Sequence, residues 1–254
     1  MTGYEILNEI LKHGYFKYND PNFYSNTGMF ILVIVGCAVI SYLLGSINCG
    51  VILSKLKYGQ DIRTQGSGNA GATNMMRTYG KGAAILTFIG DMLKTALAVA
   101  VGYFALGYYG AYAAGLFCVI GHAYPIFFQF KGGKGVVCIS TMCLLTEPVV
   151  FLIMLIIFLV ILFGYKMVSL ASVMIMLTYP LVLSMAGFAG VYGLHILIAA
   201  ITALFIVFLH RKNIARIYNH TEAKITFGKK KEETDNTTTE SSTEEENIDE
   251  NGEK

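Results

Sequence analysis

Charged side chains are scarce in this sequence. Asp, Glu, Lys and Arg make up 14% of the 254 residues, whereas an ordinary soluble domain carries about 25%. Hydrophobic residues account for 54%. These proportions exclude a typical soluble domain and predict an all-α membrane protein. They give no reason to expect nucleic acid among its partners.

Paired cysteines are also missing. The five cysteines fall in apolar segments, no two of them form a C-x-x-C pair, and no histidine neighbours them at metal-ligand spacing. An odd number of unpaired cysteines excludes a disulfide framework. We therefore interpret Cys37, Cys49, Cys118, Cys138 and Cys143 as small hydrophobic residues.

Acidic residues are few outside the end of the chain. Residues 232–254 hold ten of the seventeen Asp and Glu, so residues 1–231 carry eighteen Lys and Arg against seven acidic residues. The body of the protein is basic. The tail at 229–254 cannot bury apolar surface, and we expect it to be disordered.

The N-terminal stretch at 1–28 is a polar extension. Ile6, Leu7, Ile10 and Leu11 would share one face of a helix, which is the pattern of a short interfacial helix at a membrane surface.

Seven apolar segments follow, and we interpret each as a transmembrane helix, although the fourth is short. Lysine and arginine favour cytoplasmic loops. Seven crossings place all the basic stretches (55–81, 131–134, Lys166 and 210–216) on that side, with the N-terminus outside and the C-terminus cytoplasmic. The seven segments are 29–56, 82–106, 108–130, 136–145, 149–165, 168–187 and 191–209.

A glycine-rich stretch at 66–77 is the clearest functional signal. Its three interleaved glycines can present backbone N–H groups to an anion. Asn69, Thr73, Arg77 and Lys81 follow at steps of four, so on a helix they share one face. An ordinary loop followed by a solvated helix face is the alternative. The Rossmann and Walker A fingerprints do not fit, because no buried strand precedes the glycines and no Gly-Lys-Ser/Thr follows.

Two further segments offer similar chemistry. Gly132, Gly133 and Gly135 surround Lys134, while His210, Asn213 and Arg216 share a helix face. Such loops suit two phosphate groups. They lack the carboxylates that Mg²⁺ or Zn²⁺ require, so we expect neither a metal nor a cofactor.

Several polar residues lie inside apolar segments. Asp91 and Lys94 are three residues apart and can pair within the membrane, which favours structural support of the helix. Ser46 lies in a small-residue stretch that permits close helix packing or borders a site. A lone histidine such as His122 is more often a packing residue than a catalyst.

Together these motifs resemble the bacterial acyl-phosphate:glycerol-3-phosphate acyltransferases of the PlsY type, over about residues 43–224. The resemblance rests on four stretches in order: Leu43–Ile47 with Asp61–Arg77, Gly121–His122 with Lys131–Val136, Val168–Ser172, and His210–Ile214 with Glu222 and Lys224.

This resemblance implies that residues 29–228 form a seven-helix membrane acyltransferase domain in the bacterial cell (inner) membrane, with its active site facing the cytoplasm. It implies transfer of a fatty acyl group from acyl phosphate to the sn-1 hydroxyl of glycerol 3-phosphate. The products are lysophosphatidic acid and phosphate, the first step of phospholipid synthesis. A soluble partner enzyme would make the acyl phosphate.

Roles for individual residues follow from the motifs. We expect direct roles in catalysis for Ser67, Arg77, Lys134, His210 and Asn213. We expect substrate binding by Ser46, Asn69, Thr73, Lys81, Gly132, Gly133, Gly135 and Ser169, and structural support from Asp91, Lys94 and Glu222.

Two groups are candidates for the base that takes the hydroxyl proton: His210 and a substrate phosphate. The lack of carboxylates in these loops favours the phosphate. The His-x-x-x-x-Asp motif of other glycerolipid acyltransferases is missing, since no Asp stands five residues after any histidine. An anion transporter is the main alternative, because intramembrane charges would fit it. A lipid-binding module without activity is a weaker one.

Overall fold

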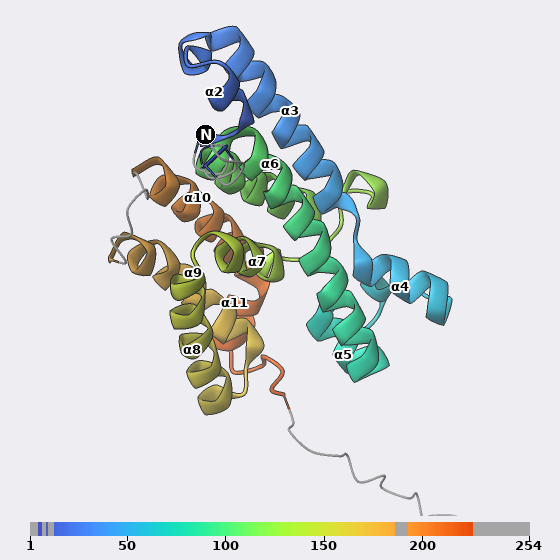
Figure 1. Cartoon of the computed structure of the whole chain (residues 1–254). Helices are drawn as coiled ribbons and strands as arrows, with labels where there is room; N and C mark the ends of the chain where they lie inside the picture. The colour runs from blue at the N-terminus through green and yellow to red at the C-terminus, as the bar shows by residue number, and fades with distance from the viewer. Residues whose placement is uncertain (1–4, 7–8, 10–12, 186–192, 226–254) are drawn as a thin grey trace, which may run out of the picture.

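The computed structural model describes residues 5–6, 9, 13–185 and 193–225, and these parts are helical without a strand (Figure 1). Leu7, Ile10, Leu11 and the acidic tail lie outside the described residues. The α-helices are α2 (Tyr15–Asn19), α3 (Thr27–Ser46), α4 (Cys49–Tyr58), α5 (Ala72–Tyr79), α6 (Lys81–Ala123), α7 (Val136–Thr146), α8 (Pro148–Tyr165), α9 (Val168–Met185), α10 (Gly193–Leu209) and α11 (Arg211–Tyr218). Short 3-10 turns lie at Phe23–Ser25, Ile62–Thr64 and Ile126–Phe128.

The first predicted span is interrupted. α3 ends at Ser46, and α4 starts again at Cys49 after two non-helical residues. Asn48 is buried and caps α4, since its side-chain oxygen accepts a hydrogen bond from the Val51 amide at 3.1 Å. The long apolar run is therefore two helices separated by Ile47 and Asn48.

The second and third predicted spans together make up α6, which is interrupted in its middle. Leu106 and Gly107 are not helical, and Gly107 has φ 62° and ψ −145°, a backbone conformation that favours glycine. A β-carbon on Gly102 would lie 2.2 Å from the carbonyl oxygen of Gly110. This close approach shows that α6 turns back on itself at the break.

The fourth predicted span, α7, has 11 residues. At 1.5 Å per residue it is about 16 Å long, short of the ~30 Å hydrocarbon core. By length and composition, four helical stretches among the described residues can cross a membrane (27–58, 81–128, 148–165 and 168–185), or five if α10 and α11, bent by 58°, count together. Each predicted segment is helical over most of its described residues, whereas seven crossings and their orientation stay a prediction.

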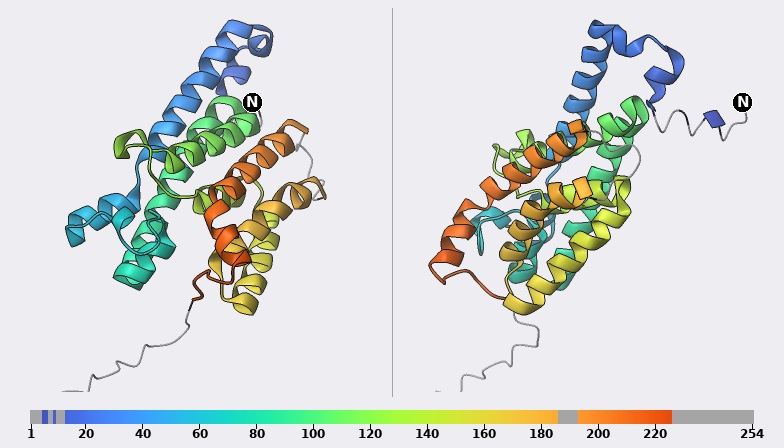
Figure 2. Two further views of the ribbon diagram at one scale, coloured as in Figure 1. Left: turned by 180° about the vertical axis from the view of Figure 1, so that it is seen from behind. Right: turned by 90° about the vertical axis from the view of Figure 1, so that its left-hand side faces the viewer.

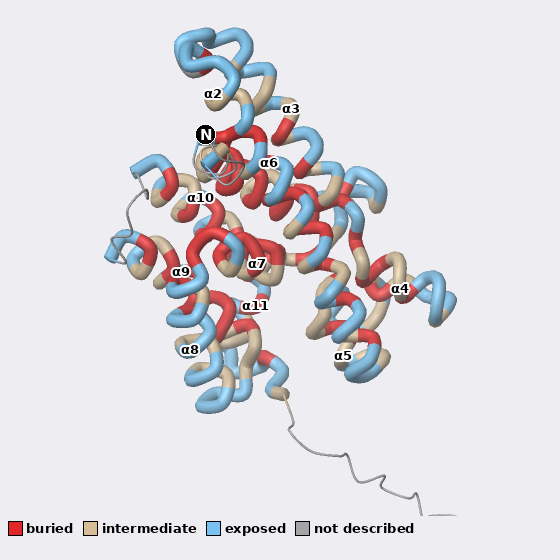
Figure 3. Tube along the Cα trace, in the orientation of Figure 1, coloured by how far each residue is buried: buried red, intermediate tan, exposed pale blue. Residues whose placement is uncertain are grey.

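The main hydrophobic core lies where α6 and α7 meet α8, α9 and α10, and α3 packs against α6 beside it (Figure 3). The outward face of α8 is apolar and exposed, including Leu152, Ile156, Val160 and Phe163, as expected for a helix in contact with lipid. α5, α11 and the end of the described chain lie at one end of the bundle, and α2 lies at the other (Figures 1 and 2). The predicted functional loops therefore share one end of the molecule.

Candidate active site

The glycine-rich loop is held by a buried asparagine. Asn74 accepts a hydrogen bond from the Ser67 amide at 2.9 Å and donates to the Gln65 carbonyl at 3.0 Å. α5 then begins at Ala72, and in the described structure no side chain caps its N-terminus at Gly71. The first amides of α5 are therefore left for an anion, and the helix dipole favours one.

The second glycine-bearing loop is closed by its own backbone. The amides of Gly132 and Gly133 donate to the carbonyls of Ala123 and His122, both at 3.0 Å. A β-carbon would lie 2.0 Å from the His122 oxygen at Gly132, and 2.1 Å from His122 Nε2 at Gly133. These two glycines close the loop, so their amides are not retained as phosphate donors.

α7 starts directly after this loop. Gly135 has φ 76° and, like Gly71, provides no side-chain cap for the helix that it precedes, so far as the structure describes the chain. Lys134 stands one residue before this uncapped end. A cation and a second helix N-terminus thus come together beside the first loop.

The carboxylate of Glu222 is hydrogen-bonded to three side chains from the C-terminal half of the chain. Glu222 accepts hydrogen bonds from Ser169 Oγ and Asn213 Nδ2 at Oε1, and from Arg216 Nε at Oε2, each at 2.7 Å. Asn213 in turn accepts a hydrogen bond from Lys134 Nζ. These bonds connect α9 and α11 to the loop before α7.

Two basic groups of this cluster have shifted pKa values. Burial lowers the pKa of Lys134 to about 8; Glu222 opposes the shift, and Arg216 and Arg77 add to it. Burial, followed by the charge of Lys134, lowers the pKa of His210 to about 4. His210 Nδ1 lies 2.8 Å from the Ile206 carbonyl oxygen. Because a carbonyl can only accept, Nδ1 carries the proton and Nε2 of the neutral ring is an acceptor.

An arginine joins the two glycine-bearing loops. Arg63 donates to both carboxylate oxygens of Asp61, at 2.9 and 2.7 Å. Its Nη1 also donates to the carbonyls of Phe128 and Lys131, the latter at 3.1 Å. Hydrogen bonding to Arg63 is the main reason why the Asp61 pKa is low.

A buried ion pair lies on α6 beside these loops. Lys94 Nζ is 2.8 Å from Asp91 Oδ1. The same nitrogen is also 2.8 Å from the Ile47 carbonyl oxygen and 2.8 Å from His122 Nδ1. The pair predicted from spacing is present, and it includes a histidine from the second half of α6.

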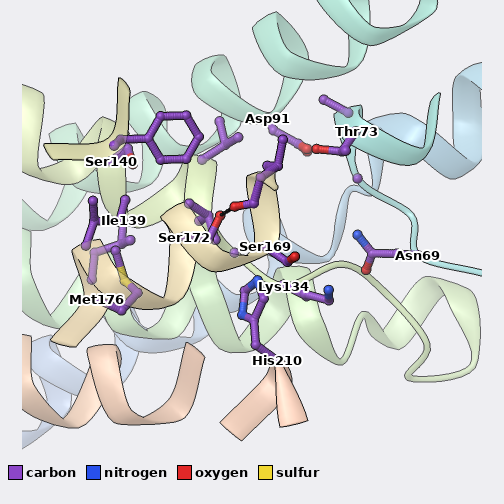
Figure 4. A pocket seen from close by; sticks show the side chains of 18 of the residues that line it. Asn69, Thr73, Asp91, Lys134, Ile139, Ser140, Ser169, Ser172, Met176 and His210 are labelled. Atoms are coloured by element: carbon purple, nitrogen blue, oxygen red, sulfur yellow. Dashed lines mark hydrogen bonds between the residues drawn. The ribbon is translucent and has the colours of Figure 1, made fainter. Parts of the chain in front are cut away.

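A cavity of about 320 Å³ connects these groups (Figure 4). Its polar end is lined by residues from both loops and the C-terminal cluster, including Asn69, Thr73, Arg77, Lys134, His210 and Asn213. Its other end runs between α7, α8 and α9 and is lined by apolar side chains, including Val137, Ile139, Phe151, Met154, Phe158 and Met176. Such a cavity can take a molecule with an anionic head and a hydrocarbon chain.

Residues 35–220 match the family model described as glycerol-3-phosphate acyltransferase. The chain belongs to this family. It is 41% identical over 205 residues to a glycerol-3-phosphate acyltransferase of Exiguobacterium sibiricum, covering 80% of this chain and 100% of the relative. It is 41% identical over 187 residues to the Bacillus subtilis enzyme of the same name, covering 74% of this chain and 95% of the relative.

Two solved structures of an integral membrane glycerol 3-phosphate acyltransferase, PlsY, have similar folds. The glycerol 3-phosphate form has a TM-score of 0.70 at 36% identity, covering 76% of this chain and 96% of the other. The lysophosphatidic acid form has a TM-score of 0.67 at 34% identity, covering 76% and 95%. The protein is an acyltransferase enzyme, which excludes the predicted alternatives of a transporter and a lipid-binding module as its principal activity.

Most residues predicted for the site of this acyltransferase line one cavity. The cavity-lining ones are Ser67, Asn69, Thr73, Arg77, Asp91, Lys134, Gly135, Ser169, His210, Asn213 and Glu222. Five predicted residues are not among its lining: Ser46, Lys81, Lys94, Gly132 and Gly133.

The prediction that one continuous helix carries Asn69, Thr73, Arg77 and Lys81 on a single face is wrong. Asn69 precedes α5, and Gly80, with φ 86°, separates α5 from α6, so that Lys81 begins a different helix and is exposed. Ser46 is buried and donates to the Tyr42 carbonyl at 2.8 Å. Its position indicates packing of α3 against the loop before α7.

Asn74 and His122 line the cavity of this acyltransferase, although they were not among the predicted site residues. Asn74 stands inside the glycine-rich stretch, but nothing in its spacing distinguishes it from Asn69. His122 was interpreted as a packing residue, although it contacts Lys94 and lines the cavity. Its occurrence directly before the second loop, in the Gly121–His122 motif, is the signal that could have identified it.

Proposed function

We propose that this acyltransferase moves a fatty acyl group from acyl phosphate to the sn-1 hydroxyl of glycerol 3-phosphate, releasing lysophosphatidic acid and inorganic phosphate. One observation carries the proposal: a single cavity joins cations and uncapped helix N-termini to an apolar channel. An acyl phosphate has the matching parts, a charged head and a hydrocarbon chain. The forms named for the solved relatives contain the acceptor and the product.

Arg77 and Lys134 would neutralise the two phosphate groups. A guanidinium can bind a phosphate through two parallel hydrogen bonds, whereas an ammonium acts as a compact charge. Asn69, Thr73 and Ser67, from the glycine-rich loop and the start of α5, line the cavity and would donate hydrogen bonds to phosphate oxygens. The N-termini of α5 and α7 add backbone donors there.

The glycerol part would lie between the two cations and the C-terminal cluster. His210 Nε2 is an acceptor for a glycerol hydroxyl, and Asn213 is held beside it by Glu222. The acyl chain would extend into the apolar end between α7, α8 and α9. This placement brings the hydroxyl to the carbonyl at the point where the polar and apolar ends meet.

The reaction needs positioning more than a strong protein base, because a mixed anhydride is already activated. The hydroxyl oxygen attacks the carbonyl carbon, the bond from that carbon to the phosphate oxygen breaks, and the proton passes to a substrate phosphate oxygen. Both oxygens of Glu222 already accept hydrogen bonds, and burial disfavours a charged His210. Those two observations support the phosphate, whose second pKa is near 6.

We also propose that the site faces the cytoplasm of a bacterial cell, with seven crossings and the N-terminus outside. The cationic loops and α11 share one end of the bundle, as the preference of Lys and Arg for cytoplasmic loops would require (Figure 1). A cytoplasmic site would receive acyl phosphate from a soluble partner enzyme and glycerol 3-phosphate from solution.

The test is a turnover assay with purified protein, acyl phosphate and labelled glycerol 3-phosphate, run in parallel with acyl-CoA. Equal amounts of labelled lysophosphatidic acid and released phosphate are expected with acyl phosphate, and no product with acyl-CoA. Lysophosphatidic acid formed from acyl-CoA but not from acyl phosphate would refute acyl phosphate as the donor. Digestion of the product with a lipase specific for the sn-1 position would refute the regiochemistry if the acyl group were retained.

A further inference from the structure

The ammonium of Lys94 fixes the tautomer of His122. Lys94 Nζ is hydrogen-bonded at 2.8 Å to the Ile47 carbonyl and to His122 Nδ1, and it forms an ion pair at 2.8 Å with Asp91 Oδ1. An ammonium has three N–H donors and no acceptor. His122 Nδ1 must therefore accept the hydrogen bond from Lys94, and the proton of the neutral ring sits on Nε2.

Nε2 of His122 points away from this network. A β-carbon placed on Gly133 would lie 2.1 Å from Nε2, so glycine at that position leaves the nitrogen uncovered. Both partners of the ring, Lys94 and Asp91, contact Nδ1, and Nε2 has no hydrogen-bond partner among the described residues. The ring is buried yet lines the cavity. In the described part of the chain, Nε2 is thus a donor without an acceptor.

The position of this donor along the cavity is informative. Gly133, which faces Nε2, directly precedes the cation Lys134, and the apolar lining starts two residues later at Val136 and Val137. The loop that faces Nε2 thus joins a charged lining residue to apolar ones, and we place His122 at the junction of the two ends on that basis. In an acyl phosphate bound as proposed, that junction is occupied by the acyl carbonyl.

From this geometry we infer that His122 is a further catalytic residue, which donates its Nε2 hydrogen to the carbonyl oxygen of the acyl donor. The inference rests on the proposed function. When the sn-1 hydroxyl attacks the carbonyl carbon, the carbonyl electron pair moves to that oxygen, and the hydrogen bond stabilises the developing negative charge. When the bond to phosphate breaks, the pair returns to re-form the carbonyl, and His122 keeps its proton throughout.

In this arrangement Asp91 and Lys94 orient the His122 ring. They hold Nδ1 as an acceptor and fix the ring plane, so the donor is oriented before the reaction starts. The backbone oxygen of His122 also accepts from the Gly133 amide at 3.0 Å, which holds the ring and the Lys134 loop at a fixed spacing. A buried, fixed donor stabilises an oxyanion more than a mobile one in water.

Two amide substitutions separate the two ring nitrogens. The amide of His122→Gln reaches the place of Nε2 and can donate there, whereas the shorter amide of His122→Asn reaches only the place of Nδ1. Loss of one oxyanion donor typically lowers kcat by about 10²–10³. For His122→Asn we expect that loss in kcat with KM for glycerol 3-phosphate changed less than about threefold, and for His122→Gln we expect at least tenfold recovery of kcat.

His195 on α10 provides a matched control, since it is as buried as His122 but does not line the cavity. His195→Asn should keep kcat within about threefold when the protein remains folded, as judged by size-exclusion elution and thermal unfolding in detergent. A folded His122→Asn with kcat within threefold of wild type would overturn the inference. Equal losses in folded His122→Asn and His122→Gln would overturn it as well, because they would show a positioning role without donation.

A measurement on the wild-type protein avoids variants altogether. In ¹⁵N-histidine-labelled enzyme, the His122 signals should report a protonated Nε2 and an unprotonated Nδ1. Nε2 should shift when a non-hydrolysable acyl phosphonate binds. A proton on Nδ1, or no shift of Nε2, would refute donation. Wild-type turnover with acyl-CoA alone would refute the proposed donor but leave the His122 comparison valid, since both donors contain the same carbonyl.

Discussion

Asn213 and Glu222 are joined by a hydrogen bond of 2.7 Å from Nδ2 to Oε1. The other end of the same amide, Oδ1, accepts from Lys134 Nζ. A carboxylate can only accept and an ammonium can only donate, so the amide has one orientation that satisfies both. Glu222 thereby positions Lys134 through Asn213, although Glu222 lies outside the residues that match the family model.

Glu222→Gln should lower both activity and stability. The amide group would present hydrogens to at least one of three donors, Ser169, Asn213 and Arg216. A hydrogen bond to a charged group contributes about 1.5–3 kcal/mol, so we expect kcat/KM to fall roughly 10- to 150-fold. Thermal unfolding and steady-state kinetics check this. The exposed neighbour Lys224 gives the control Lys224→Gln, which should match wild type; a wild-type rate for Glu222→Gln would contradict the positioning role.

Lys134 should make binding of phosphorylated substrates pH-dependent. Its pKa is lowered to about 8, so the free enzyme loses this charge as the pH rises through that value. We expect KM for glycerol 3-phosphate to rise up to about tenfold per pH unit above pH 8. In Lys134→Arg the guanidinium stays charged, and the rise should disappear. An identical pH profile in both proteins would assign the titration to another group.

His210→Gln should keep most of the activity. The His210 pKa of about 4 leaves the ring neutral and weakly basic at physiological pH, and glutamine retains a hydrogen-bonding group. We expect a rate within about tenfold of wild type, and an acid limb of kcat/KM near pH 6 that belongs to the substrate phosphate. A loss of 10²–10⁴, the usual effect of removing a general base, would instead assign the proton to His210.

Arg77 and Lys81 stand four residues apart but should behave differently. Arg77 lines the cavity and also donates to the Ala223 carbonyl at 3.2 Å, whereas Lys81 is exposed at the start of α6. Arg77→Gln should raise KM for a phosphorylated substrate roughly 10- to 150-fold, from the loss of a charged hydrogen bond. Lys81→Gln should stay within about twofold. Similar effects of both changes would show that net charge alone matters.

Much of the fold followed from apolar periodicity and charge placement. Most described residues of each predicted apolar segment are helical, and the three cationic segments meet in one cavity, because intramembrane helices must satisfy their own backbones and charged groups avoid lipid. The turn-back at Leu106–Gly107 matched a predicted boundary between two spans. The interruption at Ile47–Asn48 was missed, because the small, weakly polar residues at 45–50 were interpreted as helix-packing residues and Asn48 was not recognised as a helix cap.

The details of the site were harder to predict because they depend on contacts distant in sequence. The Gly132 and Gly133 amides could have bound phosphate, but the carbonyls at the end of α6 take them. His122 looks like any other polar residue on an apolar helix until Lys94, 28 residues earlier, is known to contact its ring. Such pairings arise from tertiary packing, and a single sequence carries no periodic signal for them.

The contact of Arg63 with two loops has a mechanical consequence. Its guanidinium binds Asp61 in the first loop and the carbonyls of Phe128 and Lys131 in the second. The two loops are thus linked directly by one guanidinium, although Arg63 itself does not line the cavity. We expect this link to keep the spacing of the loops constant when a ligand binds, so that replacing Arg63 would loosen the site without removing a cavity-lining group.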